Sequence, residues 1–267
     1  MPTALNTEAL EKLYSKYNRR EYVHPDPLEF LYEYDDPADR EIVGLLASSL
    51  AFGRVVQILK SVSCVLHRMG TPSVFLARSS RESLRREFGD FKHRWVTGEE
   101  LAAMLYDAKR VIERHGSLEA CFESGLRHEH DTVLPALCGF VDSMRLESGG
   151  ACGSLLPSPR MGSACKRLNL FLRWMVREDG VDPGGWYNVG PFRLVVPLDV
   201  HMYRICLALG MTERKQADMR TATEVTARFR KIVPEDPVRY DFALTRIGIL
   251  GKRPEALLEE IGLRGAA

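Results

Sequence analysis

A proline-rich turn followed by cationic residues is the segment whose residue types most clearly suggest chemistry. The turn runs from Leu155 to Gly162, and a predicted helix opens directly after it with Lys166 in its first turn. Such a turn leaves backbone N–H groups unpaired at a helix N-terminus, where the positive end of the helix dipole lies. We therefore expect a phosphate to bind here, with Lys166, Arg167 and Arg173 adding positive charge.

A carboxylate occupies a second distinctive position. Asp199 follows the apolar run from Leu194 to Leu198 and precedes a helix predicted from Val200 to about Leu209. A carboxylate in this position either caps the helix or faces a cleft in which a lysine balances its charge. Two plainer interpretations stay open at this stage: Asp199 as a cap alone, and Lys166 as an exposed helix lysine.

Metal and cofactor sites are not indicated. His201 forms an Asp-x-His pair with Asp199, but no third or fourth ligand follows at a matching spacing. The six cysteines lie far apart and match neither zinc nor iron–sulfur patterns, so we expect buried, reduced thiols. We expect no metal and no cofactor.

The elements that must position these residues are predicted to be helices. Apolar residues recur at helical spacing from Glu41 to Met69, with Gly53 dividing two helices. Capping residues precede several other runs; the segments predicted in this way begin near residues 7, 26, 36, 97, 117, 132, 200, 221, 236 and 254. The run at residues 194–198 is extended but too isolated to build a sheet, and the glycine-rich segment 148–154 resembles a linker. The predicted fold class is all-α.

Composition sets wide limits on the class of protein. The chain has 267 residues, 45% hydrophobic and 27% charged, which excludes a disordered or fibrous protein. No apolar run approaches the roughly 18 residues that span a bilayer, and the first residues resemble neither a signal nor a transit peptide. We expect a monomeric cytoplasmic protein without a membrane partner.

Charge is balanced overall but uneven along the chain. Lys and Arg number 37 and Asp and Glu 36, yet residues 21–41 are strongly acidic. No acid occurs from Ser148 to Arg177, and the segment from His201 to Lys231 is also rich in bases. A polyanion would bind the second half of the chain, unless these bases are ordinary solvated helix faces.

The two segments together resemble the helix–hairpin–helix superfamily of DNA glycosylases. The stretch Val196–Met202 is similar to the corresponding segment of eukaryotic 8-oxoguanine glycosylases, and the turn before Lys166 resembles the hairpin of that superfamily. The long separation of Lys166 and Asp199 resembles the archaeal 8-oxoguanine glycosylase branch, and the whole chain resembles an uncharacterised, mainly bacterial family beside that branch.

This resemblance implies a fold and a function. The fold would be two helical lobes around a cleft: residues 1–43 with 148–267 would carry the hairpin, the lysine and the aspartate, and residues 44–147 would bind the base. Lys166 would be the nucleophile and Asp199 the essential carboxylate of a DNA glycosylase with AP lyase activity in the bacterial nucleoid. Its substrate would be double-stranded DNA with a damaged base, best an oxidised purine such as 8-oxoguanine. The implied DNA contacts are Arg160, Gly162, Arg167, Arg173, His201 and Arg204.

Two other functions remain open from the sequence. The first is a protein of the same fold that binds damaged or distorted DNA without catalysis. The second is an all-helical scaffold for protein interactions. A covalent adduct between Lys166 and DNA would exclude both.

Overall fold

The fold is helical, as a computed structural model that describes residues 7–249 shows. The α-helices of this part of the chain, in sequence order, are α1 (Thr7–Tyr17), α2 (Pro37–Ser49), α3 (Val55–Met69), α4 (Pro72–Arg78), α5 (Arg81–Phe88), α6 (Gly98–His115), α7 (Leu118–Ser124), α8 (Leu134–Met144), α9 (Lys166–Val176), α10 (Val200–Ala208), α11 (Met219–Arg230) and α12 (Asp241–Ile249). The strands β1 (Lys92–His93) and β2 (Val96–Thr97) form an antiparallel hairpin. Short 3₁₀ helices occupy Arg20–Tyr22, Pro27–Glu33, Pro159–Met161 (η3) and Pro191–Arg193. The predicted all-α class is confirmed.

Capping residues explain where several helices begin. The side chain of Asp36 accepts a hydrogen bond from the amide of Ala38 at the start of α2. Thr97 and Glu100 form a reciprocal capping box at the start of α6, and Ser117 caps α7. Each of these side chains satisfies an amide that has no partner inside the helix. These starts were predicted correctly because capping is a local interaction.

Other boundaries were predicted wrongly. Thr221 does not cap a helix: the cap is Asp218, three residues earlier, whose carboxylate accepts from the amide of Thr221 at 2.8 Å. Helix α12 begins at Asp241 rather than directly after Asp236. The hairpin β1–β2 was not predicted, because its strands are too short for an alternating pattern. The helix expected at Pro254 lies outside the described residues.

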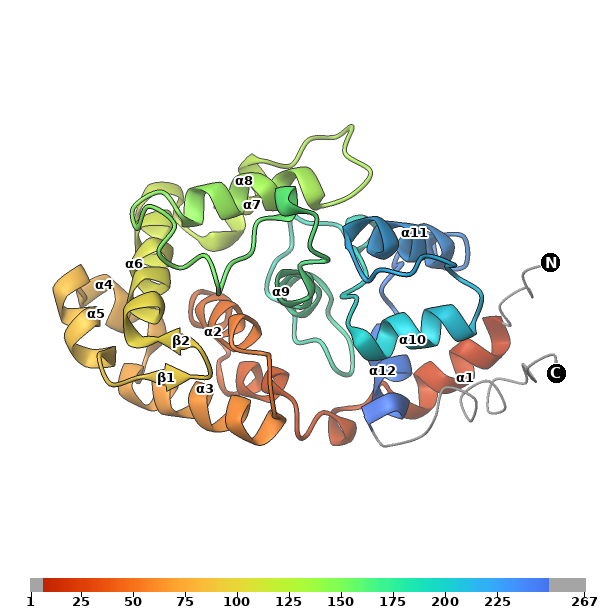
Figure 1. The fold of residues 1–267 in the computed structure, drawn as a ribbon, viewed down its shortest axis with the longest axis horizontal. Helices are drawn as coiled ribbons and strands as arrows, with labels where there is room; N and C mark the ends of the chain where they lie inside the picture. The colour runs from red at the N-terminus through yellow and green to blue at the C-terminus, as the bar shows by residue number, and fades with distance from the viewer. Residues whose placement is uncertain (1–6, 250–267) are drawn as a thin grey trace.

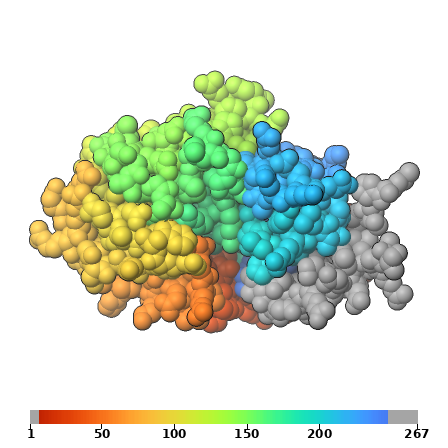
Figure 2. Space-filling model, in the orientation of Figure 1, coloured from red at the N-terminus to blue at the C-terminus, as the bar shows by residue number. Residues whose placement is uncertain are grey.

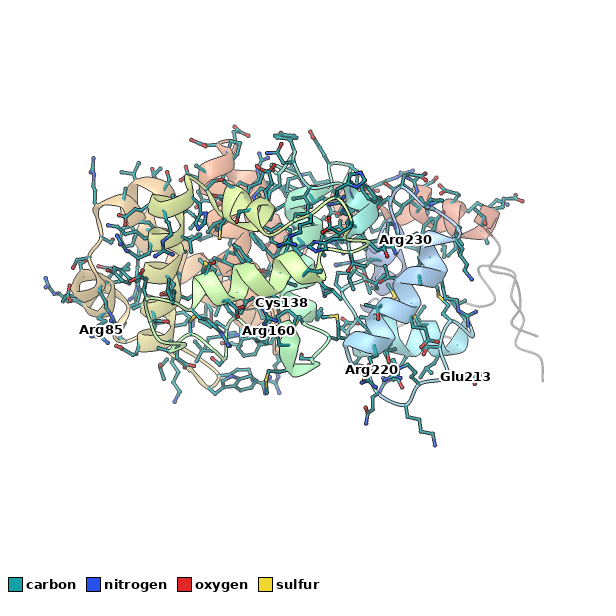
Figure 3. All side chains as sticks on the ribbon, turned by 90° about the horizontal axis from the view of Figure 1, so that it is seen from above. Arg85, Cys138, Arg160, Glu213, Arg220 and Arg230 are labelled. Atoms are coloured by element: carbon teal, nitrogen blue, oxygen red, sulfur yellow. The ribbon has the colours of Figure 1, made fainter. Side chains whose placement is uncertain are left out.

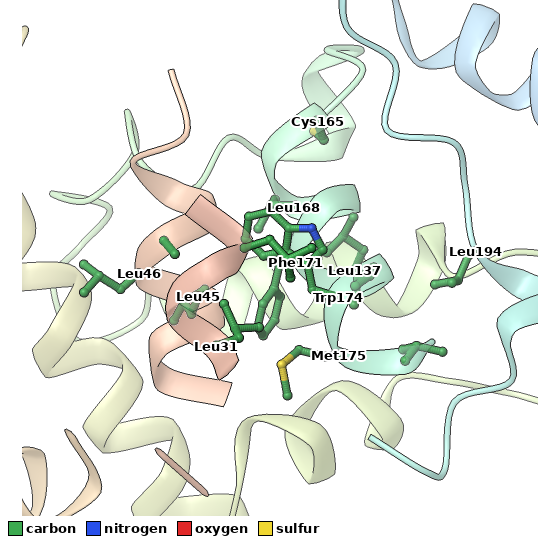
Figure 4. Packing of buried hydrophobic residues seen from close by; sticks show 14 of the residues in the cluster. Leu31, Leu45, Leu46, Leu137, Cys165, Leu168, Phe171, Trp174, Met175 and Leu194 are labelled. Atoms are coloured by element: carbon green, nitrogen blue, oxygen red, sulfur yellow. The ribbon is translucent and has the colours of Figure 1, made fainter. Parts of the chain in front are cut away.

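Helix α9 lies in the middle of the molecule. In Figure 1, α3–α6 lie on one side of it and α10–α12 with α1 on the other. Helix α2 packs directly against α9, and α10 packs against α12. Figure 4 shows the apolar side chains between these elements; the buried ones from α2 and α9 include Leu45, Leu46, Leu168, Phe171, Trp174 and Met175. This packing holds the first residue of α9, Lys166, at the end of a rigid helix.

Two features bear on the predicted division of the chain. A boundary at residue 43 falls inside α2, which is one continuous helix. The glycine-rich segment 148–154 is anchored rather than free, because the amide of Ser148 donates to Asp107 at 2.9 Å and Cys152 is buried beside the same carboxylate.

The structure also bears on the predictions about the cysteines and about membrane-spanning helices. Cys64 is exposed and Cys138 half-buried, so the prediction that all six cysteines are buried is wrong; all six are free thiols. Within residues 7–249, no helix is both long and apolar enough to cross a bilayer.

Candidate functional site

The side chains of Lys166 and Asp199 meet. The Nζ atom of Lys166 lies 3.3 Å from Oδ2 of Asp199. Lys166 is the first residue of α9, and Asp199 is the N-cap of α10, so two helix N-termini face the same point. The side chains are 35% and 20% exposed, which leaves both accessible to a ligand. The structure thus brings together the two residues that the sequence singled out.

The two oxygens of Asp199 have different partners. Oδ1 accepts a hydrogen bond from the amide of Met202 at 2.7 Å and so caps α10. Oδ2 faces Lys166. Capping holds the carboxylate in one orientation, with its second oxygen toward the amine. Asp199 is therefore a cap and a partner of Lys166 at once, and the interpretation as a cap alone does not describe it fully.

A second carboxylate lies behind this pair. Asp241, the first residue of α12, is buried, and the charges of Asp199 and Lys166 both act on it. Burial raises the pKa of Asp241 to about 6, against the attraction of Arg173. Its Oδ1 atom has no hydrogen-bond partner among the described residues, while Oδ2 accepts from Arg173. A change in the charge of Asp241 would therefore change the electrostatic potential at the Lys166–Asp199 pair.

This pKa predicts how stability depends on pH. The folded chain binds a proton at Asp241 more tightly than an unfolded chain, whose carboxyl has a pKa near 3.8. This contribution to stability is fully present below pH 3.8 and is lost as the pH rises through 6. Between pH 7.5 and pH 5, the unfolding free energy of the wild type should gain about 1 kcal/mol relative to Asp241→Asn. Urea unfolding at both pH values measures this difference; parallel pH profiles for the two proteins would contradict it.

Arg173 lies in a buried cluster of charges and does not face solvent. It is 3% exposed, and its guanidinium binds Asp182 and Asp241. Arg177, directly after the end of α9, binds the carboxylates of Asp182, Asp179 and Asp236. We call these six residues the buried arginine cluster. The expected contact of Arg173 with DNA is therefore wrong: two carboxylates already occupy its donors, which a buried charge requires.

Arg167 also points inward. Its Nη1 donates to the carbonyl oxygen of Ser49 and its Nη2 to that of Ser154, both at 2.6 Å. The guanidinium thus binds the C-terminal end of α2, where a cation interacts well with the helix dipole. Its expected role as a phosphate contact is corrected to a link between α9, α2 and the loop before η3.

The remaining predicted contacts are on the surface. Arg160 and Gly162 are exposed in the turn at η3, and His201 and Arg204 are exposed on α10. Gly162 has φ +79°, which favours glycine. Its amide donates to the carbonyl of Pro159 and so closes the turn before α9. Arg160 forms an ion pair with Asp142 at 3.0 Å.

The structure places part of the basic segment His201–Lys231 beside this turn, a position that the sequence did not predict. The amide of Met219 donates to the carbonyl of Gly162 at 3.0 Å, which joins the start of α11 to the turn. Figure 3 shows Arg160 and Arg220 on the same side of the molecule, and both side chains are exposed. The surplus of bases after His201 was the signal available in the sequence, but only the contact with Gly162 locates them.

Backbone strain marks two places. Among the described residues, two that are not glycine have positive φ: Cys165 at 45°, directly before Lys166, and Arg94 at 55°, in the turn of the β1–β2 hairpin. Such conformations cost about 1–3 kcal/mol and are found mainly at functional sites.

Among the described residues, no group of three or more His, Cys, Asp or Glu side chains could hold a metal ion.

Comparison with known proteins gives a family but no activity. The model of a family described as "Protein of unknown function (DUF2400)" matches residues 26–250 of the chain. No curated protein and no solved structure matches it. The predicted membership in the helix–hairpin–helix superfamily of DNA glycosylases is therefore wrong. A lysine at a helix start and an aspartate that caps a helix are common local devices, so two short segments that resemble a family do not identify it.

Proposed function

Since this chain belongs to the DUF2400 family, whose description names no activity, we propose a function from the chain's own residues. The chain removes a damaged base from double-stranded DNA and then cleaves the strand as an AP lyase. One observation carries this proposal: the accessible amine of Lys166, 3.3 Å from the carboxylate of Asp199. An oxidised purine such as 8-oxoguanine is the first base to test.

The residues suit the chemistry of base excision. The nitrogen of Lys166, after giving a proton to Asp199, attacks C1′ of the sugar, and the bond from C1′ to the base breaks as the base leaves with its electrons. The leaving base takes up that proton, so that Asp199 is ionised again and stabilises the positive charge left on the sugar and the amine. Asp199 then moves a proton from the bound nitrogen to the ring oxygen O4′, and the ring opens to an iminium between Lys166 and C1′. Loss of a proton from C2′ then expels the 3′ phosphate, and water releases the amine.

The surface around Lys166 supports a DNA partner. Arg160 is exposed in the turn that precedes α9, and Arg220 is exposed at the start of α11, which is hydrogen-bonded to that turn. Lys215, before α11, and Arg204, on α10, are exposed as well. In Figure 2, the segments around residues 90–100, 150–165 and 195–220 share one face of the molecule. Bases clustered on one face form the electrostatic footprint of a nucleic-acid-binding protein.

The proposal includes the arrangement of the DNA. The duplex would lie across this face, over a cleft between two helical lobes made of residues 1–43 with 148–267 and of residues 44–147. The damaged nucleotide would leave the stack to reach Lys166, which costs a few kcal/mol of unstacking. The chain would act as a monomer on DNA in the cytoplasm.

Borohydride trapping tests the function. The full chain is incubated with a duplex that carries one 8-oxoguanine or one abasic site, and borohydride reduces any iminium to a stable link. We expect a covalent adduct with the wild type and none with Lys166→Ala. Lys60→Ala is the matched control, because Lys60 is an exposed lysine on α3, and it should form the adduct at the wild-type yield.

Other results of the same assay would contradict the proposal. An adduct that persists in Lys166→Ala would exclude this lysine as the nucleophile. Tight binding without an adduct on any lesion would indicate a DNA-binding protein without catalysis. No binding to duplex DNA at about 50 mM salt, where phosphate contacts are strong, would favour a helical scaffold for protein interactions.

A further inference from the structure

An exposed tryptophan at the tip of the β1–β2 hairpin is stacked on a half-buried phenylalanine from the turn between α2 and α3. The rings of Trp95 and Phe52 are stacked, with centroids 4.7 Å apart and an interplanar angle of 25°. Trp95 is 58% exposed, although tryptophan is usually well buried. We call Trp95 and Phe52 the aromatic platform. A large ring held in the open on a second ring has apolar area available for a flat partner.

The platform is held in place from below. His93, buried between the rings and α3, contacts the edge of Phe52 with ring centroids 4.7 Å apart. Burial lowers the pKa of His93, so the ring is neutral at pH 7. Its Nε2 donates to the carbonyl of Phe52 at 3.0 Å, and Nδ1 accepts from the hydroxyl of Ser61 at 2.9 Å. Phe52 is therefore fixed by its backbone as well as by its ring.

The hairpin turn that presents Trp95 is strained. Arg94 has φ 55°, a conformation that side chains other than glycine rarely adopt. Gly53, in the turn between α2 and α3, has φ +102°, which favours glycine, and the side chain of Arg94 packs over it, with Cδ 3.0 Å from where a Cβ atom would lie. The strained turn holds the ring of Trp95 in solvent, and strain of this kind is concentrated at functional sites.

The surroundings of the platform are cationic. Neither Leu50–Met69 nor Phe91–Gly98 contains an acidic residue. Arg54, Lys92 and Arg94 are exposed, and the guanidinium carbon of Arg94 lies 4.9 Å from the centre of the Trp95 ring. Flat aromatic groups next to positive charge match a nucleotide, whose base is flat and whose phosphate is negative. An apolar protein partner would gain nothing from these charges.

Arg167 connects the platform to the start of α9. The guanidinium carbon of Arg167, the residue after Lys166, lies 4.9 Å from the centre of the Phe52 ring. The same guanidinium binds the carbonyl of Ser49. The residue that follows Lys166 in the chain therefore packs against the platform, and Figure 1 shows the hairpin on the α2 side of α9.

We propose that the aromatic platform stacks against an unpaired nucleobase of the DNA strand that reaches Lys166. This inference rests on the proposed function for its choice of DNA and adds the residues that hold the base. The base lies on the exposed face and edge of Trp95, with the side chain of Arg94 moving aside or covering it. Stacking of this kind is tolerant of sequence, since every base has a flat face.

Tryptophan fluorescence tests the proposal directly. Of the three tryptophans, Trp174 and Trp186 are 1% and 2% exposed, so an added ligand can contact only Trp95. We expect single-stranded DNA, and a duplex with one unpaired base, to quench the emission of the wild type. Heparin, a polyanion without bases, should not. Trp95→Ala should weaken binding to the unpaired base by about 5- to 100-fold, and Trp95→Phe should lose much less.

A matched control and the opposing results complete the design. Val56→Ala shortens another exposed apolar side chain, on α3, and should keep the wild-type quenching. Equal quenching by heparin, or unchanged affinity in Trp95→Ala, would overturn the platform. If the wild type is quenched but forms no borohydride adduct, the platform is supported and the proposed catalysis is contradicted. If the wild type forms the adduct but is not quenched, the catalysis is supported and the platform is contradicted.

Discussion

Replacing Arg173 by methionine is expected to lower the free energy of unfolding by about 3–5 kcal/mol. Methionine fills a similar space but removes the charge that Asp241 and Asp182 share. Asp182 keeps Arg177, whereas Asp241 is left as a buried carboxylate whose described neighbours offer it no other donor. Removing one partner of a buried ion pair is costly because the other stays desolvated. Urea unfolding at pH 7.5 measures the loss.

Two further variants check the explanation. Arg173→Met combined with Asp241→Asn should recover part of the loss, because the carboxylate left without a partner is then neutral. Arg160→Met removes an exposed ion pair with Asp142 and should leave the urea midpoint unchanged. A small effect of Arg173→Met, or no recovery in the double variant, would show that the buried arginine cluster does not support α9 in this way.

The second large effect is expected at Asp199. Asp199→Asn keeps an oxygen that can accept from the amide of Met202, but loses the negative charge that faces Lys166. We expect the rate of base excision to fall by about 10²- to 10⁴-fold, the usual contribution of a positioned acid or base. The unfolding free energy should change little, because the cap of α10 remains. Single-turnover cleavage of an 8-oxoguanine duplex measures the rate.

Asp199→Ala separates the two roles of this residue. Alanine cannot cap α10, so this variant should lose about 1 kcal/mol of stability in addition to the activity lost by Asp199→Asn. If Asp199 were a cap alone, Asp199→Asn would keep the wild-type rate and only Asp199→Ala would be impaired. Comparing rate and unfolding for both variants therefore tells a carboxylate that takes part in the reaction from one that only caps a helix.

A site residue could be predicted from the sequence when its interactions are with residues close to it in the chain. Lys166 and Asp199 were found because each stands at a helix start that is visible in a few residues, and the prediction that they share a site matches the 3.3 Å between them. Arg167 and Arg173 were misassigned because their partners, Ser49 and Asp241, are far away in the sequence. A list of basic residues does not distinguish an arginine that faces water from one that binds a buried carboxylate.

The sequence by itself determined most of the helices and their starts and singled out Lys166 and Asp199, because caps, glycine breaks and apolar spacing act within one or two turns of chain. Only the tertiary structure decided which charges are buried, that Asp241 lies behind the pair, and that Trp95 rests on Phe52 in the open. These outcomes depend on how α2, α9 and α12 and the β1–β2 hairpin pack, and packing brings together residues whose separation along the chain carries no local signal.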